Sequence, residues 1–433
     1  MEALGPVRKT SLPGVRGLGW RLVRTFANLR FRLLLVSLIA LPAAYQFVVA
    51  GILVPLSSLD IMRDFGIYYR AARMVTAGKS IYDLSSATTP WENLATYVYS
   101  PALAVLLQPL GRLPLEAAQP IWMTWSLGCL MVAIIATGSA AGARTIEPWS
   151  LVGLAFVSSY PVVLNLQLGQ LNTTLLALIS VWMWAYVRGR RSGWLLIGIA
   201  TAVKLYSAPL LLLPLLRRDL KALLLAGIGG VAVLLLGVQY LPQFLFGVLP
   251  RIGVVSAGIN NTSILGSVAR LLHPQDIHAT RDAGWADVRV IALLLAITTI
   301  AGCVLALRRL ADDADGRRLG AALMLAAGPL FASVLWEQHL VMLLPAIVVT
   351  MPILWRRRDR LGVGFLAAAT VWLAVAYPLI AEGLAPNFHY AFWIVLLYAD
   401  QGGLGALVVF LVLLRACLLQ GEGATVQLSR IRL

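Results

Sequence analysis

Long apolar runs separated by short basic clusters are the feature of this sequence that most limits its possible folds. Residues 33–54 contain no charged side chain, and comparable runs recur as far as residue 418. A helix needs about 20 mostly apolar residues to cross the hydrocarbon core of a bilayer. Segments of about ten residues with alternating polarity, which are typical of membrane β-barrels, do not occur. The sequence therefore predicts an all-α, polytopic transmembrane helical bundle of about 12 helices.

The composition excludes a water-soluble protein of this size. Of the 433 residues, 60% are hydrophobic and 12% are charged, against roughly 45–50% and about 25% in soluble proteins. The net charge of +16 does not indicate nucleic-acid binding, because the basic residues form clusters between apolar runs, as at 188–191, 217–221 and 356–360. Clusters of this kind are typical of loops that stay in the cytoplasm.

The basic clusters also predict the domain organisation. Residues 1–32 are expected to form a basic cytoplasmic segment, residues 33–418 the transmembrane domain and residues 419–433 a cytoplasmic tail. Two polar stretches, 55–98 and 240–288, are expected to be external loops. The first apolar run is longer than a signal-peptide core and lacks a small-residue cleavage site, so we expect it to be a retained helix.

The number of membrane crossings is restricted between the first external loop and the next basic cluster. Apolar segments occur near 99–112, 118–141, 149–164 and 169–187, and the chain is expected to be back in the cytoplasm at Arg188. Starting outside, this requires an odd number of crossings. One segment therefore does not span, and 99–112 and 149–164 are the candidates because both are short and contain or adjoin proline.

Lys204 lies in the middle of residues 193–216, an apolar stretch bounded by basic clusters on both sides. Because the basic clusters predict that both ends lie in the cytoplasm, we expect a tight hairpin of two short half-helices with Lys204 near its tip. A charged side chain at the centre of a membrane helix costs roughly 2.5–3.5 kcal/mol on insertion scales, so such residues are typically functional.

Two acids follow the first helix, and either could act as a base. Asp64 precedes a run of aromatic residues, and a carboxylate there could accept a proton from a bound hydroxyl. The alternative is a solvated loop acid, or an ion-pair partner for Arg63 or Arg70. Asp60 is open to the same two interpretations and is the alternative base.

Further polar candidates are spread along the chain. Gln170 belongs to a polar stretch, 167–172, that could line a cavity or tie helices together by hydrogen bonds. Arg270 could hold a phosphate by charge-assisted hydrogen bonds, or could contact lipid headgroups. Asn261 lies in the same external loop, and His339 follows Trp336 between two apolar runs. The histidines have no zinc-like spacing, and the three cysteines lie in apolar runs, so no metal centre is expected.

The order of these motifs resembles that of glycosyltransferase family 87. The motifs are Asp64-Phe-Gly-Ile-Tyr-Tyr-Arg-Ala-Ala, Tyr97-Val-Tyr-Ser-Pro, Gly169-Gln-Leu-Asn, Lys204-Leu-Tyr-Ser-Ala-Pro, Asn260-Asn-Thr-Ser and Trp336-Glu-Gln-His-Leu, within residues 33–418. Mycobacterial members of this family transfer mannose from polyprenyl phosphate to phosphatidylinositol mannosides. The resemblance implies a GT-C fold, with a helical membrane bundle and an active site at its outer face.

The resemblance also implies roles for individual residues. Asp64 matches the general base of the family. The residues implied to bind the donor phosphate or the substrates are Lys204, Arg270, His339, Tyr68, Asn261 and Gln170. The implied reaction is an inverting transfer of a hexose, mannose being the family's usual sugar, from a polyprenyl-phosphate donor to a lipid or glycan acceptor, without a cofactor or metal.

The implied location is the plasma membrane of a bacterium, with both termini in the cytoplasm. The rival interpretation is a transporter or flippase for a polyprenyl lipid or sugar, because broken helices and a buried lysine also suit a substrate path at mid-membrane. The absence of matching halves and the gathering of polar residues on one side favour the enzyme.

Overall fold

The computed structural model describes residues 29–58, 62–82, 97–252, 254–258, 261–274, 285–372 and 392–431, and in these the regular structure is entirely helical. Labels beginning with η denote 3₁₀ or π segments. In the first half of the chain the elements are α2 (Leu29–Val48), η1 (Val49–Leu53), α3 (Val54–Ser57), α4 (Arg63–Thr76), α5 (Pro101–Leu106), α6 (Gln108–Gly111), α7 (Leu115–Ala141), α8 (Ile146–Val157), α9 (Tyr160–Leu168), α10 (Asn172–Val187), η2 (Arg191–Gly193), α11 (Trp194–Val203), η3 (Leu205–Leu211) and α12 (Leu212–Leu216).

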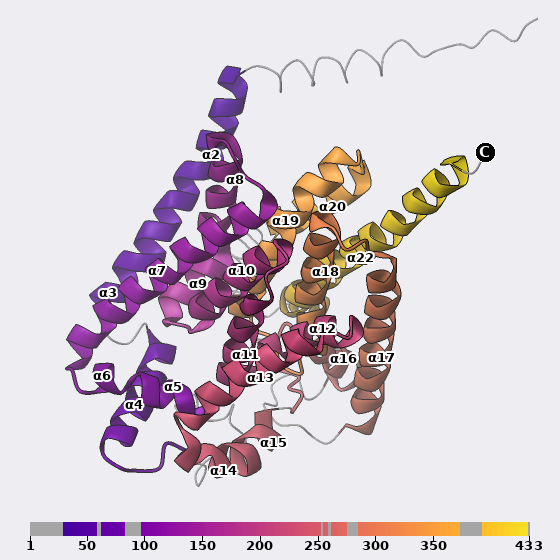
Figure 1. The fold of residues 1–433 in the computed structure, drawn as a ribbon. Helices are drawn as coiled ribbons and strands as arrows, with labels where there is room; N and C mark the ends of the chain where they lie inside the picture. The colour runs from indigo at the N-terminus through magenta and orange to yellow at the C-terminus, as the bar shows by residue number, and fades with distance from the viewer. Residues whose placement is uncertain are drawn as a thin grey trace, which may run out of the picture.

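The second half continues the same all-helical pattern. Its elements are α13 (Leu220–Leu235), η4 (Val238–Tyr240), α14 (Leu241–Gln243), η5 (Phe244–Val248), α15 (Leu249–Ile252), α16 (Ile264–Leu272), α17 (Ala286–Arg309), α18 (Ala314–Ala327), η7 (Gly328–Phe331), η8 (Glu337–Met342), α19 (Leu343–Arg356), α20 (Arg360–Val371) and α22 (Phe392–Ile431). Figure 1 shows these helices gathered in one bundle.

The predicted transmembrane helical bundle is confirmed. Within the described residues five helical stretches are long and apolar enough to cross a membrane: Ala40–Ser57, Leu115–Ala141, Ala286–Arg309, Glu337–Arg356 and Asp400–Gln420. Two bent pairs, α8 with α9 at 54° and α13 with the helices to Ile252 at 82°, bring the number to as many as seven. The protein is therefore a multi-pass membrane protein.

The structure also distinguishes the two segments that were candidates not to span. Residues 99–112 form only α5 and α6, of six and four residues, which are too short to cross a bilayer. Residues 149–164 fall in the bent pair α8 and α9. Beyond the expected domain end at 418, α22 continues as helix to Ile431.

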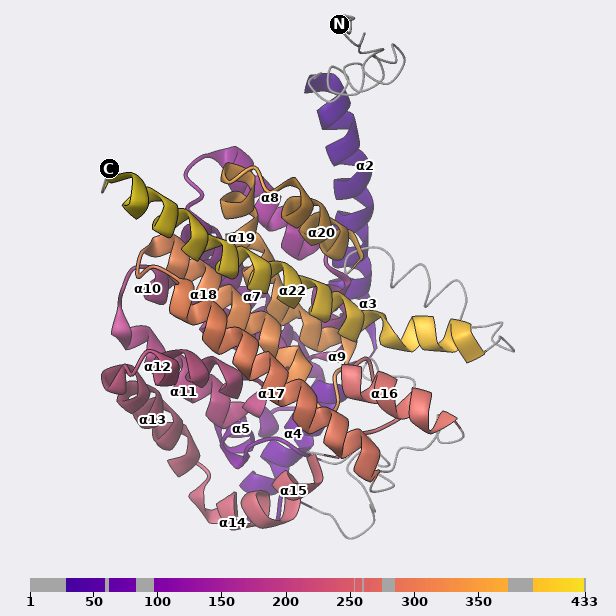
Figure 2. The same cartoon turned by 90° about the vertical axis from the view of Figure 1, so that its right-hand side faces the viewer.

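The most deeply buried helices are α10, α18 and α19. Nine consecutive residues of α18, from Leu319 to Ala327, are buried, and 78% of the apolar stretch Glu337–Arg356 is buried inside the bundle. Large apolar side chains are exposed on α13 and α17, for example Leu224 and Leu293. Such exposed apolar surface is expected on helices that face lipid. In Figure 2, α17, α18 and α22 run beside one another.

The basic clusters converge on one end of the bundle, which we call the basic end. There Arg318 donates to the carbonyl of Ala140 at the end of α7 (2.7 Å) and pairs with Asp315 (2.6 Å), which also pairs with Arg356 at the end of α19 (2.9 Å). Arg217, after α12, pairs with Asp312 (3.3 Å), and Arg415 of α22 pairs with Asp359 (2.5 Å). The helix ends that carry basic clusters in the sequence are thus neighbours in space.

Candidate functional site

The predicted hairpin is present, and Lys204 stands at its tip. Helix α11 runs from the basic end to Val203, the backbone is extended at Lys204 (φ −150°, ψ 119°), and η3 and α12 return. An ion pair between Arg191 and Asp219 (2.9 Å) joins the two ends of the hairpin. Because α11 has ten residues and a helix rises 1.5 Å per residue, Lys204 lies about 15 Å from the basic end. This is about half the thickness of the hydrocarbon core.

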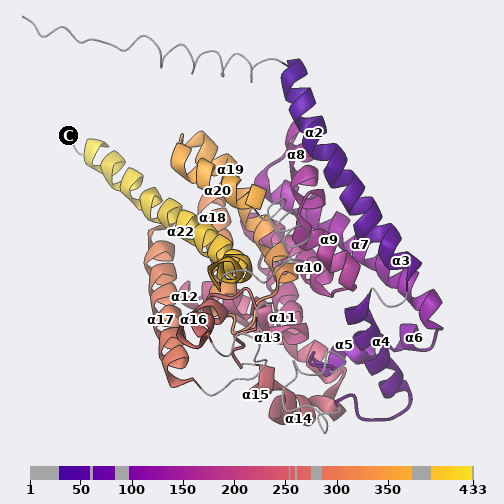
Figure 3. The same ribbon diagram turned by 180° about the vertical axis from the view of Figure 1, so that it is seen from behind.

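Asp64 is presented by α4, which lies with α5 and α6 beside the start of α7 (Figures 1 and 3). It sits in the first turn of α4 and is partly exposed. The Gln170 side chain binds it: its amide nitrogen donates to Asp64 Oδ2, and its carbonyl accepts from the hydroxyl of Tyr68 (3.1 Å). Gln170 and Tyr68 are fully buried, so they fix the carboxylate relative to α9 and α10.

A tight turn places Gln170 there. Gly169 ends α9 in the left-handed conformation (φ 64°), and its carbonyl accepts from the indole of Trp122 (2.9 Å). A Cβ at Gly169 would lie 2.7 Å from the Cβ of Phe65, which is closer than carbon atoms can pack. Glycine is required both by the conformation and by the approach of α4.

Lys204 is held by side chains from two other helices. Its ammonium donates to Asn172 Oδ1 (2.9 Å) and lies 3.0 Å from Nε2 of His339. Asn172 begins α10, two residues after Gln170, so one turn of chain carries the partners of both Asp64 and Lys204. His339 belongs to η8, and Asn165 binds the adjacent carbonyl of Gln338 (2.7 Å). Most of these partners are buried, whereas Lys204 as a whole residue is partly exposed.

Aromatic rings surround these charged groups. The ring of Tyr99 lies 5.3 Å from the Lys204 ammonium and meets the Tyr68 ring edge-on at 4.9 Å. The ring of Trp336 stacks on His339 with centroids 5.9 Å apart. A cation over a ring is stabilised by about 0.5–2 kcal/mol. We call Asp64, Tyr68, Gln170, Lys204 and His339, with Asn172 and Tyr99, the Asp64–Lys204 group.

Burial raises the pKa of the Asp64 carboxyl above its usual value. The hydrogen bond from Gln170 and the positive charges of Lys204 and Arg63 oppose this rise. A carboxylate with a raised pKa is a stronger proton acceptor, as general-base catalysis requires. The group therefore combines a proton acceptor with a cation that could stabilise a leaving anion.

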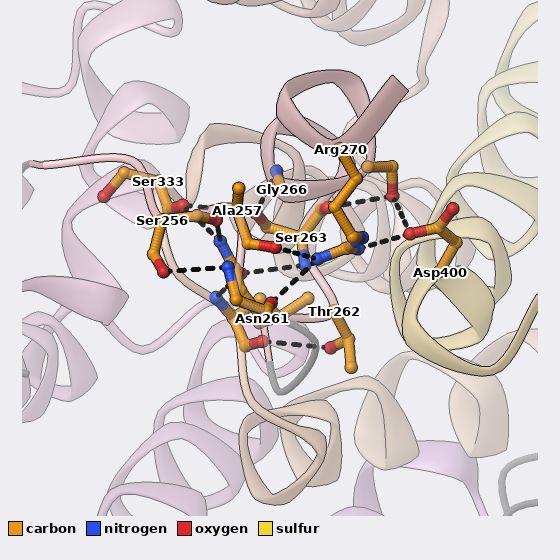
Figure 4. Close-up of polar contacts among 12 residues, drawn as sticks. Ser256, Ala257, Asn261, Thr262, Ser263, Gly266, Arg270, Ser333 and Asp400 are labelled. Carbon is orange, nitrogen blue, oxygen red and sulfur yellow. Dashed lines mark hydrogen bonds and ion pairs between the residues drawn. The ribbon is translucent and has the colours of Figure 1, made fainter. Parts of the chain in front are cut away.

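Arg270 and Asn261 lie in a second group of polar residues, shown in Figure 4 and called here the Asn261–Arg270 cluster. The guanidinium of Arg270 is buried, pairs with Asp400 of α22 and donates to the carbonyls of Gly258 (2.9 Å) and Ala257 (3.4 Å). Ser267 donates to the same carboxylate (2.7 Å). Buried charge is tolerated when it is paired and hydrogen-bonded in this way.

Asn261 joins the cluster to the segment before His339. Its amide nitrogen donates to the carbonyls of Ser256 (2.7 Å) and Ser333 (3.1 Å), and its oxygen accepts from the backbone of Ser263 (3.1 Å) and Leu335 (2.9 Å). The whole donor and acceptor capacity of the side chain is therefore used. The segment that it fixes leads directly to Trp336 and His339.

The structure thus brings together five of the predicted site residues and sets two apart. Asp64, Tyr68, Gln170, Lys204 and His339 form one group, while Asn261 and Arg270 are bonded within their own cluster. Asp60, the alternative base, lies outside the described residues. Among the side chains that the structure describes, no three histidine, cysteine, aspartate or glutamate residues are placed to hold a metal ion.

Sequence reasoning missed the partner of Arg270. Asp400 was not among the predicted site residues, yet it accepts from both Arg270 and Ser267. A signal was available, because Asp400 begins the apolar stretch Asp400–Gln420, and ionisable residues in such positions usually pair with one another.

Comparison with known proteins decides the class of enzyme. The model of glycosyltransferase family 87 matches residues 97–332, which is more than half of the chain. The chain belongs to glycosyltransferase family 87. It is a membrane glycosyltransferase, and the transporter interpretation is set aside. The matched range includes Gln170, Lys204, Asn261 and Arg270, whereas Asp64 and His339 lie outside it.

Three curated proteins that the chain resembles are mycobacterial mannosyltransferases. A polyprenol-phosphate-mannose-dependent alpha-(1-2)-phosphatidylinositol mannoside mannosyltransferase of Mycolicibacterium smegmatis is 28% identical, over 72% of this chain and 75% of its own length. The enzyme of the same name from Mycobacterium tuberculosis is 29% identical, over 68% and 71%. A pentamannoside mannosyltransferase of M. smegmatis is 27% identical, over 77% and 82%. No solved structure matches significantly.

Proposed function

We propose that the protein transfers a hexose, mannose by preference, from a polyprenyl-phosphate donor to a lipid or glycan acceptor. The observation that carries this is the Asp64–Lys204 group, which combines a proton acceptor with a cation at the tip of the Lys204 hairpin. The related enzymes are named for a polyprenol-phosphate-mannose donor and a phosphatidylinositol mannoside acceptor. Their similarity supports the same donor class here.

The reaction is a single displacement at the anomeric carbon. Asp64 accepts the proton of the acceptor hydroxyl as its oxygen forms a bond to the anomeric carbon. The bond from that carbon to the phosphate oxygen breaks, and polyprenyl phosphate leaves with an additional negative charge. Because attack and departure occur on opposite faces of the ring, the anomeric configuration inverts, and a β-linked donor gives an α-linked product.

Lys204 is proposed to stabilise the leaving phosphate. Its ammonium is held in place by Asn172 (2.9 Å) and by the ring of His339 (3.0 Å). A preorganised cation aimed at developing charge is the usual means by which such a site lowers the barrier. Tyr68 and Gln170 hold the base, and His339 is proposed to contact the donor phosphate beside Lys204.

Direct contacts of Arg270 and Asn261 with a substrate stay a prediction. The polar atoms of both side chains are bonded mainly within the Asn261–Arg270 cluster. We therefore propose that they act indirectly, by fixing the segment that carries His339.

The reaction is proposed to occur on the outer side of a bacterial plasma membrane, with both chain ends in the cytoplasm. The support is the position of the basic clusters, which lie at the base of the Lys204 hairpin and not at its tip. Loops rich in arginine and lysine stay in the cytoplasm. Residues 1–32, 33–418 and 419–433 then correspond to the cytoplasmic segment, the transmembrane domain and the tail.

The experiment is sugar transfer from radiolabelled polyprenyl-phosphate-mannose to membrane lipids, by purified wild type and by Asp64→Asn. Asparagine keeps the size of the side chain but cannot accept the proton, so the wild type should transfer mannose and the variant should not. Equal transfer by both proteins would remove Asp64 as the base and make Asp60 the next variant. Transfer by neither protein would reject mannose as the sugar and call for other donors.

A further inference from the structure

A cavity at the basic end is separate from the Asp64–Lys204 group. It has a volume of about 650 Å³ and lies where the turn between α19 and α20 meets α22. Its basic lining residues are Arg357, Arg358, Arg360 and Arg415, and a single acid, Asp359, faces them. Ligand sites in proteins have volumes of about 300–1,000 Å³. Figure 2 shows α19, α20 and α22 grouped together in the bundle.

Only part of this positive charge is used within the protein. Arg415 pairs with Asp359 (2.5 Å), and Arg357 donates to the carbonyl of Ala416 (3.3 Å). The guanidinium groups of Arg358 and Arg360 make no hydrogen bond or ion pair with any residue that the structure describes. The cavity therefore has two arginines available for an anion.

The depth of the cavity corresponds to the headgroup layer of a bilayer. Two apolar spans end there: Glu337–Arg356 finishes one residue before Arg357, and Asp400–Gln420 finishes at Gln420, which lines the cavity. Leu361 and Leu419 also line it and are 68% and 43% exposed. Arginines beside exposed leucines at the end of a span match a molecule with an anionic head and an apolar body. Basic pockets between membrane helices bind phospholipid headgroups in this way.

We propose that this cavity binds the headgroup of an anionic phospholipid. The phosphodiester would be held by Arg358 and Arg360, and Leu361 and Leu419 would contact the first methylene groups of the acyl chains. This site is independent of the proposed sugar transfer and lies at the basic end, whereas the Asp64–Lys204 group lies at the tip of the Lys204 hairpin. It gives the protein a lipid partner that is neither donor nor acceptor.

Native mass spectrometry of full-length protein tests the proposal. The protein is released from nanodiscs of phosphatidylcholine with a minor fraction of phosphatidylglycerol, and the retained lipids are counted. Wild type should retain phosphatidylglycerol in preference to phosphatidylcholine. Two arginines near the membrane surface are expected to contribute about thirtyfold to the affinity. Arg358→Gln/Arg360→Gln should therefore lose the preference.

The chain offers a matched control. Arg218 stands in an equivalent turn, with the same left-handed backbone as Arg358 (φ 54° and 56°), and it also precedes an aspartate that caps the next helix. Arg218→Gln/Lys221→Gln removes two charges from the basic end without touching the cavity and should keep the preference. Equal loss in both variants would show a general surface charge effect and would reject the site.

Two further outcomes keep the proposal open to refutation. A wild type that retains both lipids equally overturns it, whether or not the arginine variant folds. Displacement of phosphatidylglycerol by millimolar glycerol phosphate would identify a site for a soluble phosphate and would also overturn it. Sugar transfer by the arginine variant shows that the protein is folded when the preference is lost.

Discussion

Replacing Gln170 by leucine is the change that most directly tests the geometry at Asp64. The Gln170 amide donates to Asp64 Oδ2, and Tyr68 and Tyr99 lie beside the pair. A hydrogen bond to a charged group contributes about 1.5–3 kcal/mol. One unit of pKa corresponds to about 1.4 kcal/mol. Loss of the donor destabilises the carboxylate, so the pKa of Asp64 should rise further, by about one to two units.

The assay is the pH dependence of kcat/KM for mannose transfer. A base must be deprotonated to act, so the rate falls as the pH falls through the pKa of Asp64. Burial already raises this pKa, so the acidic limb of the wild-type profile should lie above the ordinary range of an aspartate, which is near 4. In Gln170→Leu the limb should move to higher pH by about one to two units.

Tyr68→Phe is the matched control. It removes the hydroxyl that donates to the Gln170 carbonyl (3.1 Å) but leaves the bond from Gln170 to Asp64 in place. Its acidic limb should move much less than that of Gln170→Leu. An acidic limb that stays in place in Gln170→Leu would refute the reasoning, because the titrating group would then not be the carboxylate bound by Gln170.

Three other changes test the remaining features. Lys204→Ala should insert normally but lose about 10²–10³-fold in kcat, the usual effect of removing one group that stabilises developing charge; full activity would remove Lys204 from the mechanism. Asp400→Ala should leave Arg270 buried without its partner and cost about 3–5 kcal/mol, which thermal unfolding in detergent would detect as a lowered midpoint; an unchanged midpoint would contradict the buried pair, which has 0% exposure at Arg270. In a cysteine-free background, Asp287→Cys should react with an impermeant maleimide in intact cells and Arg190→Cys only after permeabilisation, and the reverse would overturn the topology.

The fold class could be predicted because membrane solvation leaves few alternatives. Apolar runs of sufficient length must be helical, since backbone groups in hydrocarbon have no water to bind. The hairpin at 193–216 could be predicted for a related reason: two basic flanks cannot lie on opposite sides of the membrane under the charge rule. The ion pair between Arg191 and Asp219, which joins the two ends of the hairpin, could not be predicted. These residues are 28 positions apart, and their approach depends on the angle between the two halves of the hairpin.

The grouping of Asp64 with Lys204 was less accessible from sequence. Each residue was recognised separately, but their meeting depends on Gln170 and Asn172, which face different helices from one turn after α9. A hydrogen bond between residues 106 positions apart leaves no periodic signal. Arg270 shows a second difficulty, because the sequence does not reveal what a guanidinium in an external loop binds. It can bind the phosphate of a ligand or a carboxylate of its own chain, and the structure shows Asp400 beside it.

The Asn261–Arg270 cluster and the Asp64–Lys204 group are connected through the backbone of residues 333–339. Asn261 fixes Ser333 and Leu335, the next residue is Trp336, and His339 contacts Lys204 one helical turn later. A change at Asn261 would therefore be transmitted to the Lys204 ammonium through the backbone, without replacing any residue of the Asp64–Lys204 group. A misplacement of about 1 Å at a reacting group can cost about 100-fold in rate. A buried polar network in which every donor and acceptor is used is rigid. We therefore expect the Asn261–Arg270 cluster to influence the position of the Lys204 ammonium relative to Asp64, although the two lie far apart in sequence.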